Sequence, residues 1–174
     1  MKIGLIGVGN IGFHFANRLI AAGYELCIYD KSQKALDRLS GSGVKVCSSA
    51  KDLASEVETV LLCLPMPQIV VDVATEVSQG SKVKVVVDLS TTGPSVTKQV
   101  AAILEKKQIP MIGSPVSGGI VAAEKGTLAV MASGPQDIFE NIKPILSALG
   151  KNIFYLGADP TLGQTVKIIN NTLY

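Results

Sequence analysis

Apolar and polar positions alternate with two different periods along the chain, and this pattern predicts strands and helices in regular succession. Short runs rich in branched apolar residues predict strands over 2–6, 25–29, 44–47, 59–64, 84–89, 110–116, 127–132 and 152–156. Helical periodicity predicts helices between them, over 13–23, 32–43, 68–77, 95–107 and 137–150. Several strands are continuous apolar runs, as in parallel sheets that helices cover on both faces. We therefore expect an α/β fold with a doubly wound, mostly parallel sheet.

This succession breaks near residue 157, where the segment GADPTLGQ leads into a last amphipathic helix. Helices normally carry a terminating Gly or Pro, and none follows here. We therefore predict a domain over 1–160 and the first turns of a further helix over 161–174.

Composition narrows the class of protein. The 174 residues are 47% hydrophobic and 17% charged, which is typical of a packed globular chain. A net charge of +2 with no Lys/Arg cluster argues against a nucleic-acid partner, and no apolar run is long enough to predict a membrane span. Cys27, Cys47 and Cys63 form no CxxC pair, so we expect reduced thiols in a cytoplasmic protein. With one histidine, too few ligands remain to predict a metal site.

A glycine-rich turn follows the first predicted strand. GVGNIG, residues 7–12, has the G-x-G-x-x-G spacing of Gly7, Gly9 and Gly12, with Val8, Asn10 and Ile11 between them. A strand before it and a helix after it are the context in which this motif binds the pyrophosphate of a dinucleotide. A turn without a ligand is the alternative. The motif predicts a Rossmann-type dinucleotide-binding domain over 1–160.

The second predicted strand ends at an acidic residue. Asp30 follows Gly12 by 18 residues, close to the spacing of the carboxylate that binds the adenine ribose. A carboxylate there favours NAD, because it would repel the 2′-phosphate of NADP. Lys31 and Lys34 could attract that phosphate, so NADP stays open, as does a simple surface turn at Asp30.

Two further segments follow strands and carry hydroxyl groups or glycines. Ser90 and Thr91, in DLSTTGPS, are expected to contact a ligand above the sheet. Ser117, Gly118 and Gly119 lie between a strand and a helix, where backbone N–H groups and the hydroxyl can bind an anion such as a carboxylate. The alternative for the second segment is a plain glycine turn with a serine N-cap.

The last predicted helix places Lys167 and Asn171 four residues apart on one face, with Asn170 and Gly163 beside them. Leu162, Val166, Ile169 and Leu173 form its apolar face. From the spacing alone, a Lys–Asn pair of this kind is more often a solvated surface than a site.

Together, these motifs resemble the β-hydroxyacid dehydrogenase family, which includes 3-hydroxyisobutyrate dehydrogenase and tartronate semialdehyde reductase and is related to 6-phosphogluconate dehydrogenase. The matching segments, in order along the whole chain, are IGLIGVGNIG, CLP at 63–65, DLSTTGP, PVSGG with its following GTL, and GQTVKIINN. The chain has Gly113 and Ser114 where the family usually has Asp-Ala. The motifs do not specify the substrate.

The resemblance implies roles for individual residues. Lys167 and Asn171 are expected to be catalytic, and Ser117, Gly118, Gly119 and Asn170 to bind a hydroxy-acid substrate. Leu64 and Pro65 are expected to lie over the cofactor beside Ser90 and Thr91, and Lys31 beside Asp30. The implied reaction is hydride transfer between NAD(P) and a 3-hydroxy acid or its semialdehyde. A non-catalytic dinucleotide-binding or sensing module, or an NADPH-dependent semialdehyde or imine reductase, is the alternative, although imine reductases generally replace the lysine.

The resemblance also implies that this chain is part of a longer protein. In the family, the helix that carries the lysine continues into an all-α domain that closes the site. We therefore expect 161–174 to be the start of an interdomain helix, with that domain absent and the chain poorly active alone. This longer protein is expected to be a homodimer or tetramer that assembles through the all-α domain.

Overall fold

The computed structural model describes residues 1–173, and Tyr174, the last residue of the predicted 161–174 segment, lies outside the described residues. Its strands are β1 Lys2–Ile6, β2 Glu25–Tyr29, β3 Lys45–Val46, β4 Thr59–Leu62, β5 Val85–Asp88, β6 Met111–Gly113, β7 Val116–Ser117, β8 Leu128–Ala132 and β9 Gly150–Tyr155. Its helices are α1 Asn10–Ala21, α2 Gln33–Asp37, α3 Ala50–Ala54, α4 Pro67–Val77, α5 Pro94–Glu105, α6 Gly119–Lys125, α7 Gln136–Leu149 and α8 Leu162–Thr172.

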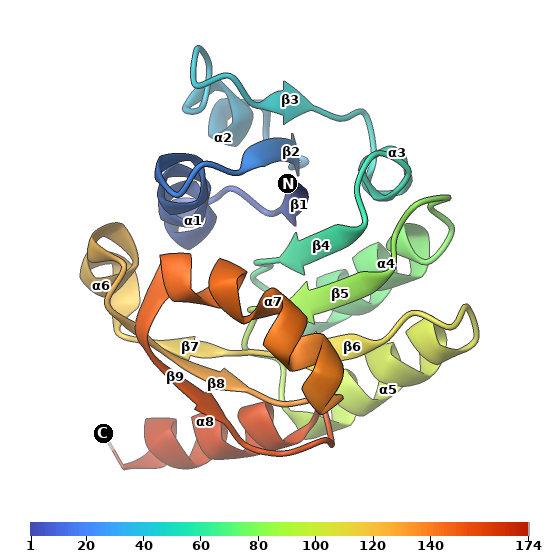
Figure 1. The fold of residues 1–174 in the computed structure, drawn as a ribbon, viewed down its shortest axis with the longest axis vertical. Coiled ribbons are helices and arrows are strands. Elements are labelled where there is room, and N and C mark those ends of the chain that lie inside the picture. The colour runs from blue at the N-terminus through green and yellow to red at the C-terminus, as the bar shows by residue number, and fades with distance from the viewer. Residues whose placement is uncertain (174) are drawn as a thin grey trace.

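The main sheet has six strands in the order β3-β2-β1-β4-β5-β6, and every pair in it is parallel. The order reverses between β1 and β4, where a doubly wound sheet opens a crevice at the carboxyl ends of its strands. Figure 1 shows β1 and β4 side by side, with the chain running outward from them in both directions. The predicted Rossmann-type fold is confirmed.

The core lies on both faces of this sheet, because the strands are apolar on both sides. Ile3 and Leu5 of β1 pack in one cluster with residues of α1 and α7, among them Phe15 and Phe139. Ile6, at the end of the same strand, belongs to a second cluster with α3, α4 and α5. The alternation of side chains along a strand distributes them in this way.

A second, smaller sheet has the order β7-β8-β9, with β7 antiparallel to β8 and β8 parallel to β9. It joins the main sheet at one antiparallel bridge between Gly113 and Ser133. The prediction of a single strand over 110–116 is therefore wrong. Pro115 has no N–H for the main ladder, and its carbonyl accepts a hydrogen bond from Met131 N of β8 at 3.0 Å. The chain thus leaves one sheet and enters the other.

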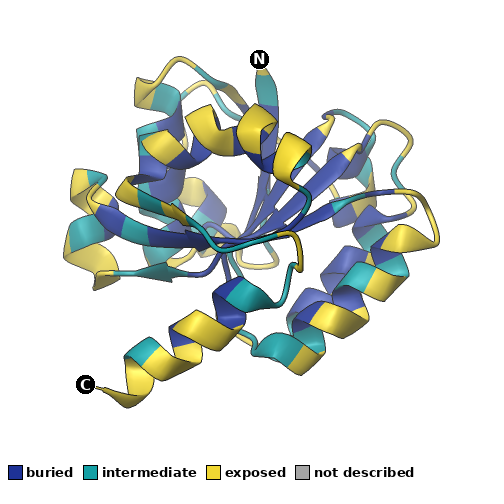
Figure 2. Cartoon of the chain, turned by 60° about the horizontal axis from the view of Figure 1, so that its bottom comes forward, coloured by how far each residue is buried: buried dark blue, intermediate teal, exposed yellow. Residues whose placement is uncertain are grey.

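α8 reverses the usual polarity of a surface helix. Its buried residues are Gly163, Gln164 and Lys167, whereas Val166, Ile169 and Leu173 are 37%, 55% and 78% exposed. Figure 2 shows α8 projecting from the body, with exposed surface over most of its length. The interpretation of Lys167 as part of a solvated helix face is therefore wrong. This face packs inward because Gln164 forms hydrogen bonds to the loop after β5, and Gly163 N donates to Ser133 Oγ just after β8.

Candidate active site

A cavity of about 410 Å³ lies at the carboxyl ends of the central strands, between α8 and the glycine-rich turn. It brings together residues that the sequence places in five separate motifs. Its lining consists of Ile11, Cys63, Leu64, Pro65, Leu89, Ser90, Thr91, Val116, Ser117, Gly118, Gly119, Lys167 and Asn171. Ten of these were predicted site residues, and Cys63, Leu89 and Val116 were not.

The glycine-rich turn is built by close backbone approach. Gly7 has φ +92°, and a Cβ at this position would overlap the Cys63 carbonyl oxygen. A Cβ at Gly12 would in turn overlap the Gly7 carbonyl oxygen. Gly9, by contrast, has no atom within 4 Å of where its Cβ would lie. Two glycines are thus required by the packing of the turn, and Gly9 leaves a free approach to the N-terminus of α1, where a phosphate is stabilised.

A second cavity, of about 300 Å³, lies over that open position. Gly9, Asn10, Ile11 and Gly12 line it on one side and Cys63, Leu64 and Pro65 on the other. Gly7 and Val8 do not line it. Both are buried within the turn, and Val8 is 0% exposed.

Asp30 lies at the end of β2 and joins two loops. Its Oδ2 accepts a hydrogen bond from Val8 N at 2.9 Å, and its Oδ1 accepts one from Ser32 N at 2.8 Å. A third cavity, of about 160 Å³, is lined by Ile6, Tyr29, Asp30, Lys31, Leu64, Pro65, Ile69 and Val73. Asp30 and Lys31 therefore border the same space.

Leu64 and Pro65 border all three cavities. This segment follows β4, and Leu64 N donates a hydrogen bond to Ser90 Oγ at 2.9 Å. The contact connects it to the β5–α5 loop, which we define as residues 89–93. Leu64 and Pro65 thus form a common wall of one elongated site.

A buried carboxyl group, that of Asp88 at the end of β5, lies just before the β5–α5 loop. Asp88 Oδ1 accepts a hydrogen bond from Ser90 N at 2.9 Å, while Oδ2 has no partner among the described residues. Burial raises the pKa of Asp88 to about 6, although the bonds from Ser90 oppose this rise. Asp88 lines none of the cavities, so it supports the loop from below.

Among the described residues that line the cavity between α8 and the glycine-rich turn, Lys167 is the one with a charged side chain. It is 8% exposed, and no carboxylate of residues 1–173 forms an ion pair with it. Burial therefore lowers the pKa of Lys167 below that of an ordinary lysine, because the ammonium loses hydration without gaining a counter-charge. At a given pH, a larger fraction of Lys167 is therefore in the neutral amine form, which can act as a base.

The other polar residues of α8 meet the β7–α6 turn. Asn170 Nδ2 donates a hydrogen bond to Ser117 Oγ at 3.2 Å, so the Ser117 hydroxyl keeps its own proton for another acceptor. Gly118 and Gly119 both have positive φ, at 135° and 70°, and are exposed at the cavity. Asn171 lines the cavity from an exposed position, whereas Asn170 does not line it.

Sequence reasoning missed the residue that joins these parts, Gln164. It is fully buried and makes three hydrogen bonds to the β5–α5 loop. A glutamine on an amphipathic helix gives no sequence signal of burial. The one available hint was its position three residues before Lys167, on the same face.

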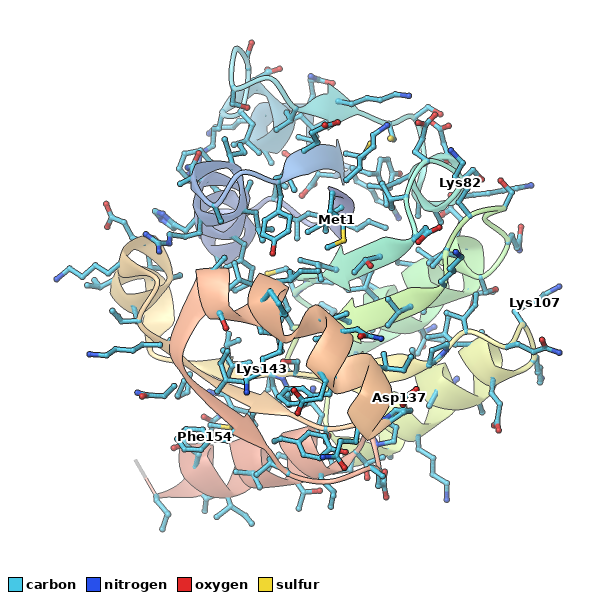
Figure 3. The ribbon with its side chains drawn as sticks, viewed as in Figure 1. Met1, Lys82, Lys107, Asp137, Lys143 and Phe154 are labelled. Carbon is cyan, nitrogen blue, oxygen red and sulfur yellow. The ribbon has the colours of Figure 1, made fainter. Side chains whose placement is uncertain are left out.

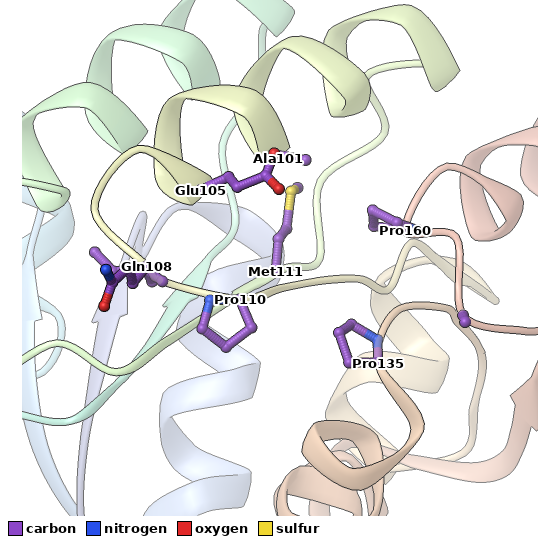
Figure 4. A pocket seen from close by; sticks show the side chains of 9 residues that line it. Ala101, Glu105, Gln108, Pro110, Met111, Pro135 and Pro160 are labelled. Carbon is purple, nitrogen blue, oxygen red and sulfur yellow. The ribbon is translucent and has the colours of Figure 1, made fainter.

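A separate cavity of about 400 Å³ lies away from all of these residues, between the end of α5 and the loops before α7 and α8 (Figure 4). Pro110, Pro135 and Pro160 surround it, with Met111 between them and Glu105 at one side. It contains none of the predicted site residues.

Within residues 1–173, no group of three His, Cys, Asp or Glu side chains is placed to hold a metal ion. No helix in this part of the chain combines the length and the apolar character needed to cross a membrane. The three cysteines are free thiols.

Residues 2–157 match the sequence profile of a family described as the NAD binding domain of 6-phosphogluconate dehydrogenase. The chain belongs to this family. The resemblance drawn from the motifs is thereby confirmed, and the cavities described above are those of an NAD-binding domain.

Similar proteins include enzymes that act on hydroxy acids. A probable mitochondrial 3-hydroxyisobutyrate dehydrogenase of Dictyostelium discoideum is 36% identical over 97% of this chain and 54% of its own length. An NAD-dependent L-serine dehydrogenase of Pseudomonas aeruginosa is 32% identical over 99% of this chain and 59% of its own length. A solved structure of Mycobacterium tuberculosis 3-hydroxyisobutyrate dehydrogenase with L-serine is similar to this chain with a TM-score of 0.94 and 28% sequence identity. The match covers 99% of this chain and 59% of that one. The chain thus spans 54–59% of the length of these relatives.

Proposed function

We propose that this chain carries the dinucleotide site and the catalytic lysine of an NAD(P)-dependent 3-hydroxyacid dehydrogenase. The observation that supports this most directly is Lys167, a buried lysine without a counter-ion. It shares one cavity with Ser117, Gly118 and Gly119 on one side and Ser90 and Thr91 on the other. A domain that only binds or senses a dinucleotide has no need of a deprotonatable lysine at that place.

On this proposal, the chain's own residues bind the acid and move one proton. Ser117 O–H and the N–H groups of Gly118 and Gly119 donate to the substrate carboxylate. The neutral amine of Lys167 accepts the proton of the 3-hydroxyl during oxidation and returns it during reduction. Asn171, at the cavity edge, donates to the same oxygen. Bound NAD(P) supplies the hydride acceptor or donor.

The residues present fit a dinucleotide. The open position at Gly9 and the adjoining cavity suit a pyrophosphate at the N-terminus of α1. Asp30 still has acceptor capacity for ribose hydroxyls, since a carboxylate accepts about four hydrogen bonds and two are used here. We propose NAD as the preferred cofactor for this reason, with Lys31 as the residue that would favour NADP.

The proposal extends to the organisation of the chain. Residues 1–160 would hold the dinucleotide, and 161–174 would begin a helix leading to an all-α domain. The exposure of Val166, Ile169 and Leu173 supports this, because an apolar stripe on a helix is normally covered. That domain would also form the homodimer or tetramer, and the free cysteines are consistent with a cytoplasmic protein.

The experiment begins with calorimetric titration of the chain with NAD and NADP separately. Hydride transfer is then measured at 340 nm with a panel of 3-hydroxy acids in the longer protein that includes the all-α domain, unmutated and as Lys167→Ala and the exposed-lysine control Lys151→Ala. We expect all three to bind a dinucleotide and the unmutated protein and the control to transfer hydride, with at least about a hundredfold loss in Lys167→Ala.

Two results would contradict the proposal. Failure to bind either dinucleotide would remove its basis. Binding that leaves every 3-hydroxy acid unreacted, in the unmutated longer protein as in its Lys167→Ala variant, would favour a non-catalytic binding module instead.

A further inference from the structure

We propose that Gln164 is a positioning residue whose side-chain amide joins α8 to the β5–α5 loop and thereby holds Lys167 opposite Ser90 and Thr91. The inference rests on the proposed role of Lys167 for its catalytic meaning. The placement of the amine itself is argued from hydrogen bonds within the chain and does not depend on that role.

All three hydrogen bonds of the Gln164 amide go to backbone groups of one loop. Its Nε2 donates to the Ser90 carbonyl at 2.7 Å. Its Oε1 accepts from Thr92 N and from Gly93 N, each at 3.1 Å. These three backbone groups lie in the irregular segment between β5 and α5, where no ladder or helix bond satisfies them. Gln164 therefore gives this segment the partners that regular structure would supply.

The bonds are made where water cannot replace them. Gln164 is 0% exposed, and Ser90 is 4% exposed. A buried amide whose partners are removed leaves unsatisfied polar groups, each of which destabilises the arrangement that lacks its hydrogen bond. The β5–α5 loop can either stay bonded to α8 or separate from it and let water in. The hydrogen bonds of Gln164 therefore favour a single position of α8 relative to this loop.

Gln164 and Lys167 are three residues apart on α8, so they lie on the same face about one turn apart. Ser90 in turn receives Leu64 N on its Oγ, which connects the loop to the wall shared by the three cavities. A single path of hydrogen bonds therefore runs from α8 through Gln164 and Ser90 to Leu64. Its effect is to set the distance between the amine and the cofactor-facing residues.

A second contact secures the start of α8 without reaching the loop. Gly163 N donates to Ser133 Oγ at 2.9 Å, and a Cβ at Gly163 would overlap the Met131 carbonyl oxygen. This contact holds the N-terminus of α8 against the end of β8. It does not determine how α8 is oriented toward the β5–α5 loop, and we assign that orientation to Gln164.

The principal test is Gln164→Met, which keeps the volume and removes all three hydrogen bonds, with the exposed α5 residue Gln99→Met as control. Lysine labelled with ¹³C at Cε reports the Lys167 titration by NMR, and Lys167→Arg identifies its signal. We expect Lys167 to titrate below ordinary lysines in the parent and the control. In Gln164→Met its pKa should return toward the ordinary lysine value, because water reaches the amine.

A merely stabilising glutamine would lower the melting temperature and leave the Lys167 titration unchanged in the folded protein, and that result would overturn the proposal. The readout needs no turnover, so it is independent of the proposed function. Where hydride transfer is observed, kcat should fall by about tenfold or more with little change in the dinucleotide KM. An unchanged kcat would reject the positioning role and leave the proposed function intact.

A conservative variant tests the same contacts if Gln164→Met does not fold. In Gln164→Glu, a protonated carboxyl can donate to the Ser90 carbonyl and accept from Thr92 N and Gly93 N, whereas a carboxylate repels that carbonyl. We expect hydrogen exchange at the Thr92 and Gly93 amides to match the parent at about pH 5 and to exceed it at about pH 8. Exchange equal to the parent at both pH values would contradict the proposal.

Discussion

The carboxylate of Asp30 accepts a hydrogen bond from the backbone N–H of Val8 at 2.9 Å, so the end of β2 holds the glycine-rich turn that follows β1. Its other oxygen accepts from Ser32 N at the start of α2. The residue that is proposed to select the ribose therefore also shapes the phosphate site. Cofactor selection and the form of the turn are connected through one side chain.

Replacement of Asp30 should consequently change cofactor preference. Asp30→Asn keeps one acceptor oxygen for the turn but removes the negative charge that would repel a 2′-phosphate. We expect NAD affinity to fall by about tenfold and NADP affinity to hold or rise, because Lys31 and Lys34 remain. Calorimetry with both dinucleotides measures the ratio, and Asp37→Asn on α2 is the control. A ratio equal to that of the parent would show that Asp30 does not select the ribose.

Gly9 and Gly12 should separate binding from stability. Gly12→Ala places a methyl group against the Gly7 carbonyl and should lower the free energy of unfolding by about 1–3 kcal/mol. Gly9→Ala meets no atom of the chain, so its unfolding free energy should stay within about 0.5 kcal/mol of the parent. Its dinucleotide affinity should nevertheless fall by about tenfold or more, since the methyl group occupies the approach to the N-terminus of α1. Urea unfolding and calorimetry on both variants check this, and unimpaired binding by Gly9→Ala would place the pyrophosphate elsewhere.

Asp88 should make stability depend on pH in the mildly acidic range. Burial raises its pKa to about 6 from an ordinary 3.8. A carboxyl whose folded-state pKa is raised contributes stability that is present below the unfolded-state pKa and is lost as pH rises through the folded-state value. Between about pH 4 and pH 7 the parent should therefore lose up to about 3 kcal/mol relative to Asp88→Asn, whose amide oxygen can still accept from Ser90 N.

Urea unfolding of both proteins at several pH values gives this difference directly, because other titrating groups cancel. Asp137→Asn, an exposed position on α7 (Figure 3), should run parallel to the parent. A pH-independent difference between the parent and Asp88→Asn would mean that Asp88 titrates normally in the folded protein.

Lys167 should cost stability at neutral pH. Its folded-state pKa is lowered by burial, so the ammonium is less favourable in the folded chain than in the unfolded one at every pH below that value. The penalty disappears as pH rises toward the ordinary lysine value. Lys167→Met should therefore raise the unfolding free energy by on the order of 1 kcal/mol at pH 7, with a smaller gain at pH 10. Chemical unfolding of this variant against Lys151→Met tests it, and a less stable Lys167→Met protein would mean that the amine is well solvated.

Most of the fold and the dinucleotide-binding part of the candidate site could be predicted from local sequence rules. The order of strands and helices was predictable because each apolar run is bounded by turn residues, and Gly7, Gly9, Gly12 and Asp30 have a spacing that few other structures require. The second sheet was not predictable in this way. β7 has two residues, and Pro115 divides a stretch whose apolar pattern is continuous.

α8 shows a different limit. A helix with polar and apolar faces is normally read with its polar face in water. Here Gln164 and Lys167 are buried, and Ile168 and Ile169 are 45% and 55% exposed, while Phe154 on β9 is also exposed at the outside of the fold (Figure 3). The decisive partners, the backbone groups of Ser90, Thr92 and Gly93, lie over 70 residues away in sequence, and periodicity carries no information about them.

The shared wall of Leu64 and Pro65 has a consequence for how a dinucleotide is recognised in parts. One short segment borders the space beside Asp30, the space over Gly9 and the space beside Lys167. A substitution that shifts this segment would therefore weaken the adenylate half and the nicotinamide half of the cofactor together, whereas a substitution at Asp30 or Gly9 acts on one end of it.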